Sequence, residues 1–286
     1  MNSSSLPRTE KKFSVTRFAV TIVLTFVSVL CIGALVLPEK VLYVQLHSPL
    51  SAYLYVFFSS QLPNCFTEWA FHRYMLHEPV FNWFYALYYK HHIRHHIALT
   101  PIVPRELEQT WRNRYPITEP KQYEASFFPW FTYAGFIIFA APFAGIAQWL
   151  LPELPILITV LFSIAWSLTV YELFHAAEHV PVEAWKKWVF SWLGKTGEKI
   201  YSFHQLHHAL TSMKLNMGIS GFVFGIPIAD MVLGTFKLPS ELLLEGAPVK
   251  PIDTYVPKPV FFVRWLDRIA KRFGDKNKQK AALTRG

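Results

Sequence analysis

Ten histidines, arranged in four short groups, are the residues of this chain that are best suited to chemistry. Two groups are pairs, His72 with His77 and His175 with His179, and a triplet follows each pair. The triplets are His92, His95 and His96 and, further along the chain, His204, His207 and His208. Imidazole is the commonest metal-binding side chain, and histidines clustered at helical spacing are typical of a metal site. The sequence therefore predicts that these ten histidines bind metal.

A histidine tag or a disordered metal-buffering tract is the alternative interpretation. The four groups, however, are spread between residues 72 and 208. They are embedded in aromatic sequence such as Tyr201-Ser202-Phe203 and not in tracts of glycine, serine or proline. This distribution favours a folded metal site.

The spacing of the histidines predicts two ions. Each residue of an α-helix turns by about 100°, so the outer histidines of a triplet share a face and the middle one points aside. If the outer histidines serve the ion of their own half of the chain, the middle ones, His95 and His207, reach across to the other ion. One group is then His72, His77, His92, His96 and His207, and the other is His175, His179, His204, His208 and His95. A register in which His91 replaces His92 is also geometrically possible.

Three acidic residues beside the histidine groups are candidates for orienting an imidazole. Glu68 lies one helical turn before His72, and Glu172 and Glu178 accompany the second pair. A solvated helix face is the alternative for each of them. His72 and His77 lie about 140° apart on an ideal helix, so both can reach one ion only if the helix bends or frays between them.

The composition is that of a membrane protein. Of the 286 residues, 52% are hydrophobic and 17% are aromatic, which is too apolar for an ordinary soluble domain. The formal net charge is +9, but the chain has no nucleic-acid-binding module, so an anionic membrane surface is the expected partner and nucleic acid is not. The two cysteines, Cys31 and Cys65, lie in apolar stretches and predict neither a disulfide framework nor a thiolate metal site.

Four apolar stretches predict membrane-spanning helices. They cover residues 18–37, 50–71, 127–151 and 154–174. Twenty helical residues rising about 1.5 Å each cross the hydrocarbon core of about 30 Å. A cleaved signal peptide is the alternative for the first stretch, but the stretch is long for a signal core and Leu37-Pro38-Glu39 makes a poor cleavage site.

The remaining segments complete the predicted fold, a single membrane domain over residues 1–286. Residues 1–17 form a basic tail, 72–126 and 175–273 form a cap that carries the histidines, and 274–286 form a flexible tail. Within the cap, residues 185–192 and 262–272 combine aromatic and basic side chains at helical spacing, which is typical of a helix lying in the membrane interface. A packed soluble helix is the alternative for both.

The distribution of positive charge predicts the orientation. Every Lys and Arg except Lys40 lies on the side of the cap, which the positive-inside rule assigns to the cytoplasm together with both termini. His47 falls on the opposite side and is not a ligand candidate. We therefore expect an all-α integral membrane protein with four transmembrane helices and a cytosolic, histidine-rich metal-binding cap. A bacterial inner membrane and the endoplasmic reticulum both suit this fold.

Two imidazole-bound ions beside a membrane predict oxidative chemistry on a lipid. Iron suits imidazole, and two irons can activate O₂ for attack on an unactivated C–H bond such as those of a lipid chain. Zinc is redox-silent, so a bimetallic zinc hydrolase of a lipid ester or amide is the runner-up, although such sites usually include bridging carboxylates. A metal-binding or metal-transport protein is a third possibility. A transporter should place its ligands at mid-bilayer depth, whereas these histidines follow the apolar stretches.

The four histidine groups resemble the histidine boxes of the fatty acid hydroxylase superfamily, which includes sterol desaturases and carotenoid hydroxylases. The boxes read HRYMLH from His72, HIRHH from His92, HAAEH from His175 and HQLHH from His204. Glu68 and the segment 227–235 are similar too, and the resemblance runs from about Leu50 to Thr235. These motifs are specific for the superfamily and say little about the substrate.

The resemblance implies a membrane dimetal oxygenase with the same ten ligands, divided five and five. It implies two iron ions, which zinc can replace in purified protein, O₂ as co-substrate, and a fatty acyl chain or sterol that is hydroxylated or desaturated. It also implies that Asp230 supports the site. Many eukaryotic fatty acid 2-hydroxylases carry a fused cytochrome b domain, for which seventeen residues before the first membrane helix are too few. We therefore expect electrons from a separate cytochrome b-type protein, or from a ferredoxin with its reductase.

Overall fold

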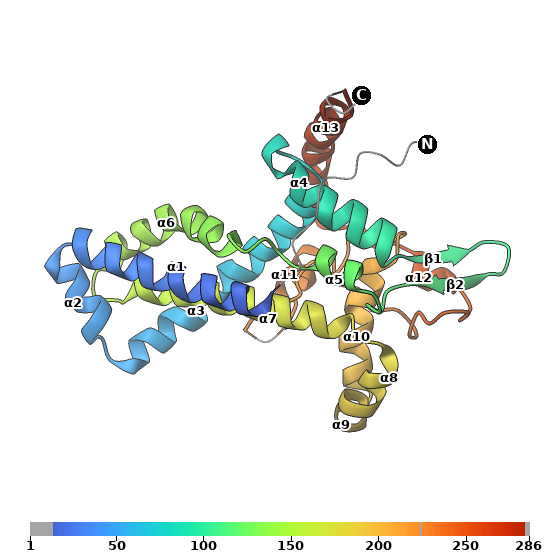
Figure 1. Cartoon of the computed structure of the whole chain (residues 1–286), viewed down its shortest axis with the longest axis horizontal. Helices are drawn as coiled ribbons and strands as arrows, with labels where there is room; N and C mark the ends of the chain where they lie inside the picture. Colours follow the sequence, from blue (N-terminus) through green and yellow to red (C-terminus); the bar gives the residue numbers. More distant parts are fainter. Residues whose placement is uncertain (1–13, 224, 284–286) are drawn as a thin grey trace.

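The computed structural model describes residues 14–223 and 225–283 (Figure 1). Residues 1–13 of the predicted basic tail and residues 284–286 of the predicted flexible tail lie outside this part of the chain. The described chain is mostly helical, as expected. It also contains one small sheet, in which β1 (Ile102–Arg105) pairs antiparallel with β2 (Thr110–Asn113). The all-α prediction is therefore correct except for this hairpin, which lies in the predicted cap segment 72–126.

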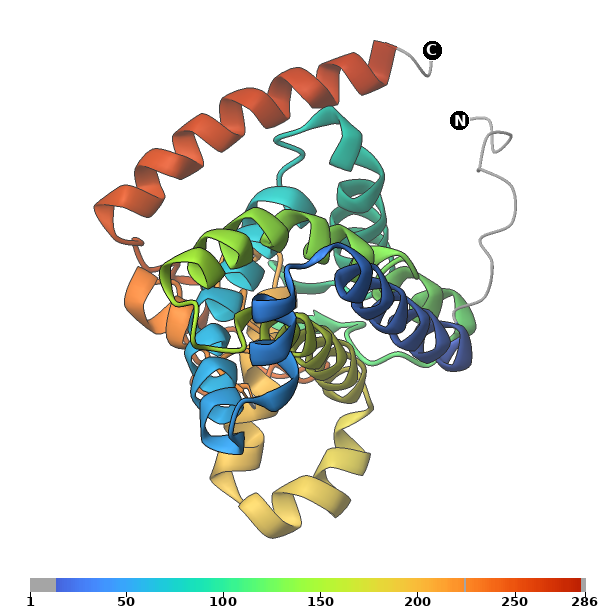
Figure 2. The same ribbon diagram turned by 90° about the vertical axis from the view of Figure 1, so that its left-hand side faces the viewer.

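Four long helices run lengthwise along one side of the molecule (Figures 1 and 2). They are α1 (Val15–Val36), α3 (Leu50–Phe71), α6 (Thr132–Leu150) and α7 (Ile156–Glu178), and the short α2 (Glu39–His47) follows α1. Helix α7 is central, because it packs against each of the other three. Within the described residues, α1, α6 and α7 are long and apolar enough to cross a membrane.

Helix α3, the second of the four predicted spans, is less apolar than the other long helices. It has 22 residues, which is long enough to cross a bilayer, but it falls outside the set that is also apolar enough. Three of its polar side chains bond to α7. The Oγ of Ser60 and the Nε2 of Gln61 donate to Ser163 Oγ at 2.7 and 2.6 Å, and Asn64 Nδ2 donates to the same hydroxyl at 2.9 Å. Such hydrogen bonds join helices where water is absent.

Shorter elements form a cap at one end of the long helices. Those before α6 are η1 (His72–Leu76), η2 (Asn82–Phe84), α4 (Tyr85–Tyr88), η3 (Tyr89–Leu99) and α5 (Pro120–Ser126). Those after α7 are α8 (Val182–Trp185), η4 (Lys186–Phe190), α9 (Ser191–Leu193), α10 (Lys195–His208), α11 (Ile228–Leu233) and α12 (Pro251–Thr254). A buried core that includes Trp111, Tyr115, Tyr201 and Leu206 joins β2 to α10. This core fixes the hairpin and α10 beside the end of α7.

The last helix, α13 (Phe261–Leu283), runs across the direction of α1 and α7 (Figures 1 and 2). The sequence predicted a flexible tail from Gly274, and for the described residues this prediction is wrong, because the helix continues to Leu283. A contact with the cap explains the difference. Lys278 Nζ lies 2.6 Å from Glu78 Oε1, and the glutamate side chain packs directly against Gly274.

Candidate metal centre

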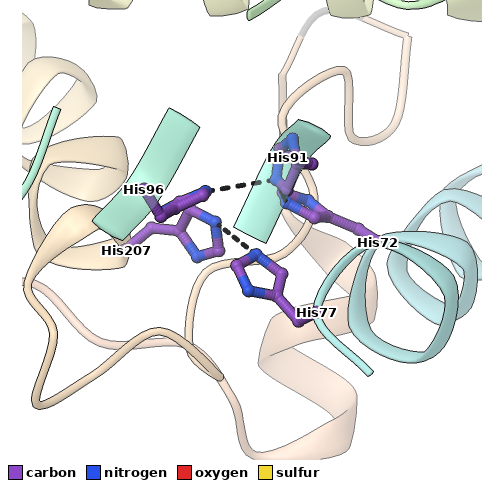
Figure 3. A group of neighbouring side chains, drawn as sticks. All are labelled: His72, His77, His91, His96 and His207. Carbon is purple, nitrogen blue, oxygen red and sulfur yellow. Dashed lines mark hydrogen bonds between the residues drawn. The ribbon is translucent and has the colours of Figure 1, made fainter. Parts of the chain in front are cut away.

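Nine of the ten predicted histidines, together with His91, converge in two buried clusters inside the cap. Within each cluster the candidate ligand atoms lie within 4.8 Å of one another, and every side chain is buried. The first cluster is His72, His77, His91, His96 and His207 (Figure 3), and the second cluster is His95, His175, His179, His204 and His208. Each cluster could hold a metal ion.

Two π-helices, η1 and η3, position most of the first cluster. In a π-helix a backbone N–H bonds to the carbonyl five residues earlier. The His77 N–H donates to His72 O at 3.1 Å, and the Thr100 N–H donates to His95 O at 2.9 Å. Residues five apart therefore share a face. This geometry brings His72 and His77 to one cluster without the bend or frayed end that an α-helix would have required.

In the first cluster, His91 occupies the place for which α-helical spacing predicted His92. On an α-helix His92 would share a face with His96, but on the π-helix η3 that position belongs to His91. The Nε2 atoms of His91 and His96 lie 3.1 Å apart. His92 is half-buried, its ring stacks on Tyr88, and its Nδ1 lies 2.9 Å from His77 Nδ1. His92 therefore contacts a member of the cluster from outside it, and the alternative register with His91 is the one that the structure contains.

Ordinary α-helical geometry positions most of the second cluster. His175 lies in the last turn of α7 and His179 caps that helix, while His204 and His208 lie in the last two turns of α10. Both pairs are four residues apart and therefore share a face. The Nε2 atoms of His179 and His204 lie 3.3 Å apart. The packing of α10 against α7 thus brings the two pairs together.

The middle histidine of each triplet lies in the opposite cluster, as the spacing predicted. His207 Nε2 lies 3.2 Å from His77 Nε2, and His95 Nε2 lies 3.2 Å from His175 Nε2. Two nitrogens bound at right angles to one ion, each about 2.1 Å away, lie about 3 Å apart. The observed separations are therefore those expected of ligands that share an ion.

Backbone carbonyls orient members of both clusters. The Nδ1–H of His72 donates to Met217 O at 2.7 Å, and the Nδ1–H of His179 donates to Tyr115 O at 2.8 Å. Each bond fixes the ring and leaves the Nε2 lone pair for the cluster, which is the usual arrangement around a bound metal. These partners could not be predicted from side-chain patterns, because every residue carries a carbonyl group.

Burial keeps the imidazoles in the neutral form that a metal requires. It lowers the pKa of His72 and of His179 from 6.5 to about 4. Burial, and then the neighbouring His207, hold the pKa of His77 well below its ordinary value. Within the described chain, the buried Nε2 of His208 has no hydrogen-bond partner, while the Nδ1 of the same ring lies 3.1 Å from the carbonyl oxygen of Thr100. A metal ion would satisfy this nitrogen, so the residues present fit a pair of imidazole-bound ions.

The acidic residues on the long helices differ in their contacts. Glu178 lies near a cluster histidine, with its Oε2 3.9 Å from His204 Nδ1. Glu68 accepts the backbone N–H of Ile219 at 2.6 Å and holds a loop in place. Glu172 accepts the backbone N–H of Phe128 at 2.8 Å. The prediction that Glu68 orients His72 is therefore wrong, because its carboxylate accepts hydrogen bonds from the backbone of this loop instead.

Asp230 supports the first cluster through one intermediate residue. Its carboxylate accepts the backbone N–H groups of Met217 at 3.0 Å and of Gly218 at 2.8 Å. The carbonyl of Met217 in turn holds His72. Burial raises the pKa of Asp230 to about 6. Asp230 therefore helps to position His72 through Met217. Its supporting role was expected only from the family resemblance.

An apolar cavity of about 530 Å³ lies between α3, α6 and α7 and ends at the first cluster. Phe143 and Ile156 line it away from the cap, and His72 and Tyr171 line it at the cap end. Ile156 and Tyr171 are fifteen positions apart in α7, which is about 22 Å at about 1.5 Å per residue. A long cavity with an apolar lining suits a hydrocarbon chain.

Tyr171 is a candidate functional residue that sequence reasoning missed. Its ring lies 5.6 Å from the ring of His175 and 6.3 Å from that of His72, measured between centroids. Its hydroxyl is buried and, within the described chain, has no hydrogen-bond partner. A tyrosine at the end of a membrane helix is ordinary, so its position between the cavity and both clusters could not be seen without the fold.

Comparisons of the chain with protein-family models, with curated proteins and with solved structures found no match. Two groups of five neutral, converging imidazoles can hold two metal ions, and one of these groups opens on an apolar cavity.

Proposed function

We propose that this protein is a membrane-bound di-iron oxygenase that hydroxylates or desaturates a lipid chain, using O₂ and two electrons. One observation carries the proposal: His72 belongs both to the first cluster and to the wall of the apolar cavity. A hydrocarbon chain in the cavity would place a C–H bond beside the ligands of an ion. A fatty acyl chain or a sterol has the apolar character that the lining requires.

The ten histidines of the two clusters would hold the ions. Iron suits an imidazole ligand set, and a bound pair would supply the O₂-activating chemistry that an unactivated C–H bond requires. The chain's own groups bind and orient the lipid, exclude water and hold the imidazoles in position. Phe143 and Ile156 line the far part of the cavity, while the Met217 carbonyl keeps the His72 ring turned towards the cluster.

We propose that α3 is a fourth span, because its polar side chains are paired with α7 and the cavity lies between these two helices and α6. The cap then faces the cytoplasm, by the distribution of Lys and Arg. Electrons would come from a separate cytochrome b-type protein or ferredoxin, and the basic charge of the chain suits an acidic carrier.

Two other functions compete with this proposal. A bimetallic hydrolase usually bridges its ions with carboxylates, but within the described chain both clusters consist of histidines alone. A metal transporter needs ligands within the bilayer. Here His72 follows the last residue of α3 and His179 follows the last residue of α7, so both lie at the ends of these helices.

The first test is the metal content of protein purified from membranes under conditions that limit metal exchange. Two iron ions per chain are expected, and both should be lost when the histidines of both clusters are replaced. Zinc in both sites of protein that retains activity on an ester or amide would support the hydrolase instead.

The second test is the lipid profile of cells that express the chain. Cells with the His204→Ala variant should lose a product that is heavier by one oxygen, or lighter by two hydrogens, than its precursor. His47→Ala is the matched control, because His47 lies at the end of α2 and belongs to neither cluster. Identical lipid profiles from cells with the His204→Ala variant and from cells whose wild-type protein is loaded with iron and supplied with electrons would contradict the proposal.

A further inference from the structure

Helix α13 has three faces with different chemistry. One face is buried against the cap and contains Val263, Ala270 and Gly274. A second face exposes the large apolar side chains of Phe262, Trp265 and Phe273. A third face exposes the basic residues Arg264, Arg268 and Lys271 together with the acidic Asp275, and Arg272 lies between this face and the aromatic one. A soluble cap would gain nothing from exposing three aromatic rings next to four basic side chains.

The start of α13 lies where α3 enters the cap. Val263 belongs to one buried cluster with Cys65 and Trp69, which lie in the last two turns of α3. From there α13 runs across the direction of α1 and α7 (Figures 1 and 2). A helix at this level and in this direction lies along the surface of a bilayer that α1 and α7 cross.

We propose that α13 binds the surface of an anionic bilayer. Its aromatic side chains would enter the boundary between headgroups and acyl chains, and its basic side chains would face anionic headgroups. An acidic soluble protein would also be attracted by the positive charges. It would leave Phe262, Trp265 and Phe273 without an apolar partner, so the lipid surface is the occupant that this set of side chains favours.

The same helix is tied to the segment that carries the first histidine pair. Asp267 accepts two hydrogen bonds from Arg73, at 2.9 and 2.7 Å, and Lys278 Nζ lies 2.6 Å from Glu78. Arg73 and Glu78 directly follow the two histidines of that pair. When α13 binds the bilayer it therefore holds this segment at a fixed height above the lipid.

The test is hydrogen exchange of the α13 backbone in the full-length protein, reconstituted in phosphatidylcholine vesicles with or without phosphatidylglycerol. Exchange across residues 261–283 should be about tenfold slower in the anionic vesicles, and high salt should remove the difference because it screens surface charge. A fourfold variant should lose this slowing while it keeps the buried face of α13: Arg264→Gln, Arg268→Gln, Lys271→Gln and Arg272→Gln.

A control variant with the same loss of charge elsewhere in the cap should keep the slowing: Arg112→Gln, Lys121→Gln, Lys195→Gln and Lys199→Gln. Equal exchange of α13 in both kinds of vesicle would overturn the proposal. So would slowing that occurs only when an acidic soluble protein is added, which would assign the helix to a protein partner. The measurement involves no turnover, so its result is independent of the proposed oxygenase activity.

Discussion

The two histidine clusters contain the same side chains on different backbones. The first cluster takes four of its five members from η1 and η3 or their ends, and these members pair at a spacing of five residues. The second takes four members from α7 and α10 or their ends, at a spacing of four. π-helices are rare and are frequently found at functional sites, so the five-residue spacing indicates that the backbone of the first cluster is shaped for its histidines. The spacing between histidines in a cluster therefore reflects the type of helix that carries them, five residues for a π-helix and four for an α-helix.

The largest effect is expected from variants that test the crossing, that is, the placement of His95 and His207 in the cluster of the opposite half of the chain. The double variant His95→Ala/His96→Ala removes one member from each cluster, so it should lose both ions. His95→Ala/His175→Ala removes two members of the second cluster and should keep the ion of the first. Metal analysis of the purified variants measures the difference. Retention of one ion by both double variants would contradict the crossing.

Single variants of His91 and His92 show which of the two histidines binds the first ion. His91→Ala should lose the first ion and lower product formation by at least about a hundredfold, because a ligand is removed. His92→Ala should keep both ions and lose at most about tenfold, because His92 only supports His77 from outside the cluster. Metal content and product formation are measured on the same preparations. A larger loss of iron and of product formation in His92→Ala than in His91→Ala would show that His92 is the ligand, as α-helical spacing predicted.

A smaller effect is expected from the positioning residue of the first cluster. Asp230→Asn should weaken binding of the first ion by about tenfold, because the loop that presents the Met217 carbonyl to His72 loses part of its support. Binding of the second ion should be unchanged. Asp253→Asn is the matched control, since this buried aspartate bonds to Ser240. Titration with metal in the presence of a competing chelator gives both affinities, and equal weakening of the two ions would argue for general destabilisation.

Tyr171→Phe tests the junction between the cavity and the clusters. The change removes only the hydroxyl, so both ions and the fold should remain. If the buried hydroxyl positions the lipid, product formation should fall by about tenfold or the position of attack on the chain should shift. The ratio of products, determined by mass spectrometry, measures this, and an unchanged ratio and rate would leave Tyr171 a packing residue.

The two clusters should respond alike to acid, because burial lowers the pKa of one histidine in each of them to the same extent. In metal-free protein, His72 and His179 both have a pKa of about 4 in the folded state, below the ordinary value of 6.5. The unfolded chain therefore binds protons that the folded chain does not, and stability falls as the pH falls from about 6.5 towards 4. Thermal unfolding of chelator-treated protein should show this loss, and His72→Gln and His179→Gln should each reduce it to a similar extent. Stability that rises on acidification would contradict the sign.

Much of the site follows from side-chain spacing alone. The crossing of His95 and His207 could be predicted, because it needs only the angle between neighbours on a helix. The same reasoning showed that His72 and His77 do not share an α-helical face, but it could not predict the π-helix that brings them together. A π-helix is chosen by backbone hydrogen bonds and tertiary packing, which leave no simple pattern in the side chains.

The contacts of the acidic residues could not be predicted for a related reason. Glu68 is close to His72 along the chain, yet its carboxylate accepts the backbone N–H groups of Ile219 and Ser220, in the loop between α10 and α11. Only the fold brings that loop to α3. The length of α13 was also missed, because its highly charged sequence resembles a solvated tail until Lys278 is seen to pair with Glu78.

The polar contacts between α3 and α7 have a consequence for how the protein enters the membrane. Ser163, which accepts hydrogen bonds from both Ser60 and Gln61, lies 102 residues beyond Gln61 in the chain. A ribosome releases α3 long before it releases this partner. We expect α3 to wait at the translocon, or at the edge of the bilayer, until α7 emerges, and to integrate stably only when it packs against α7.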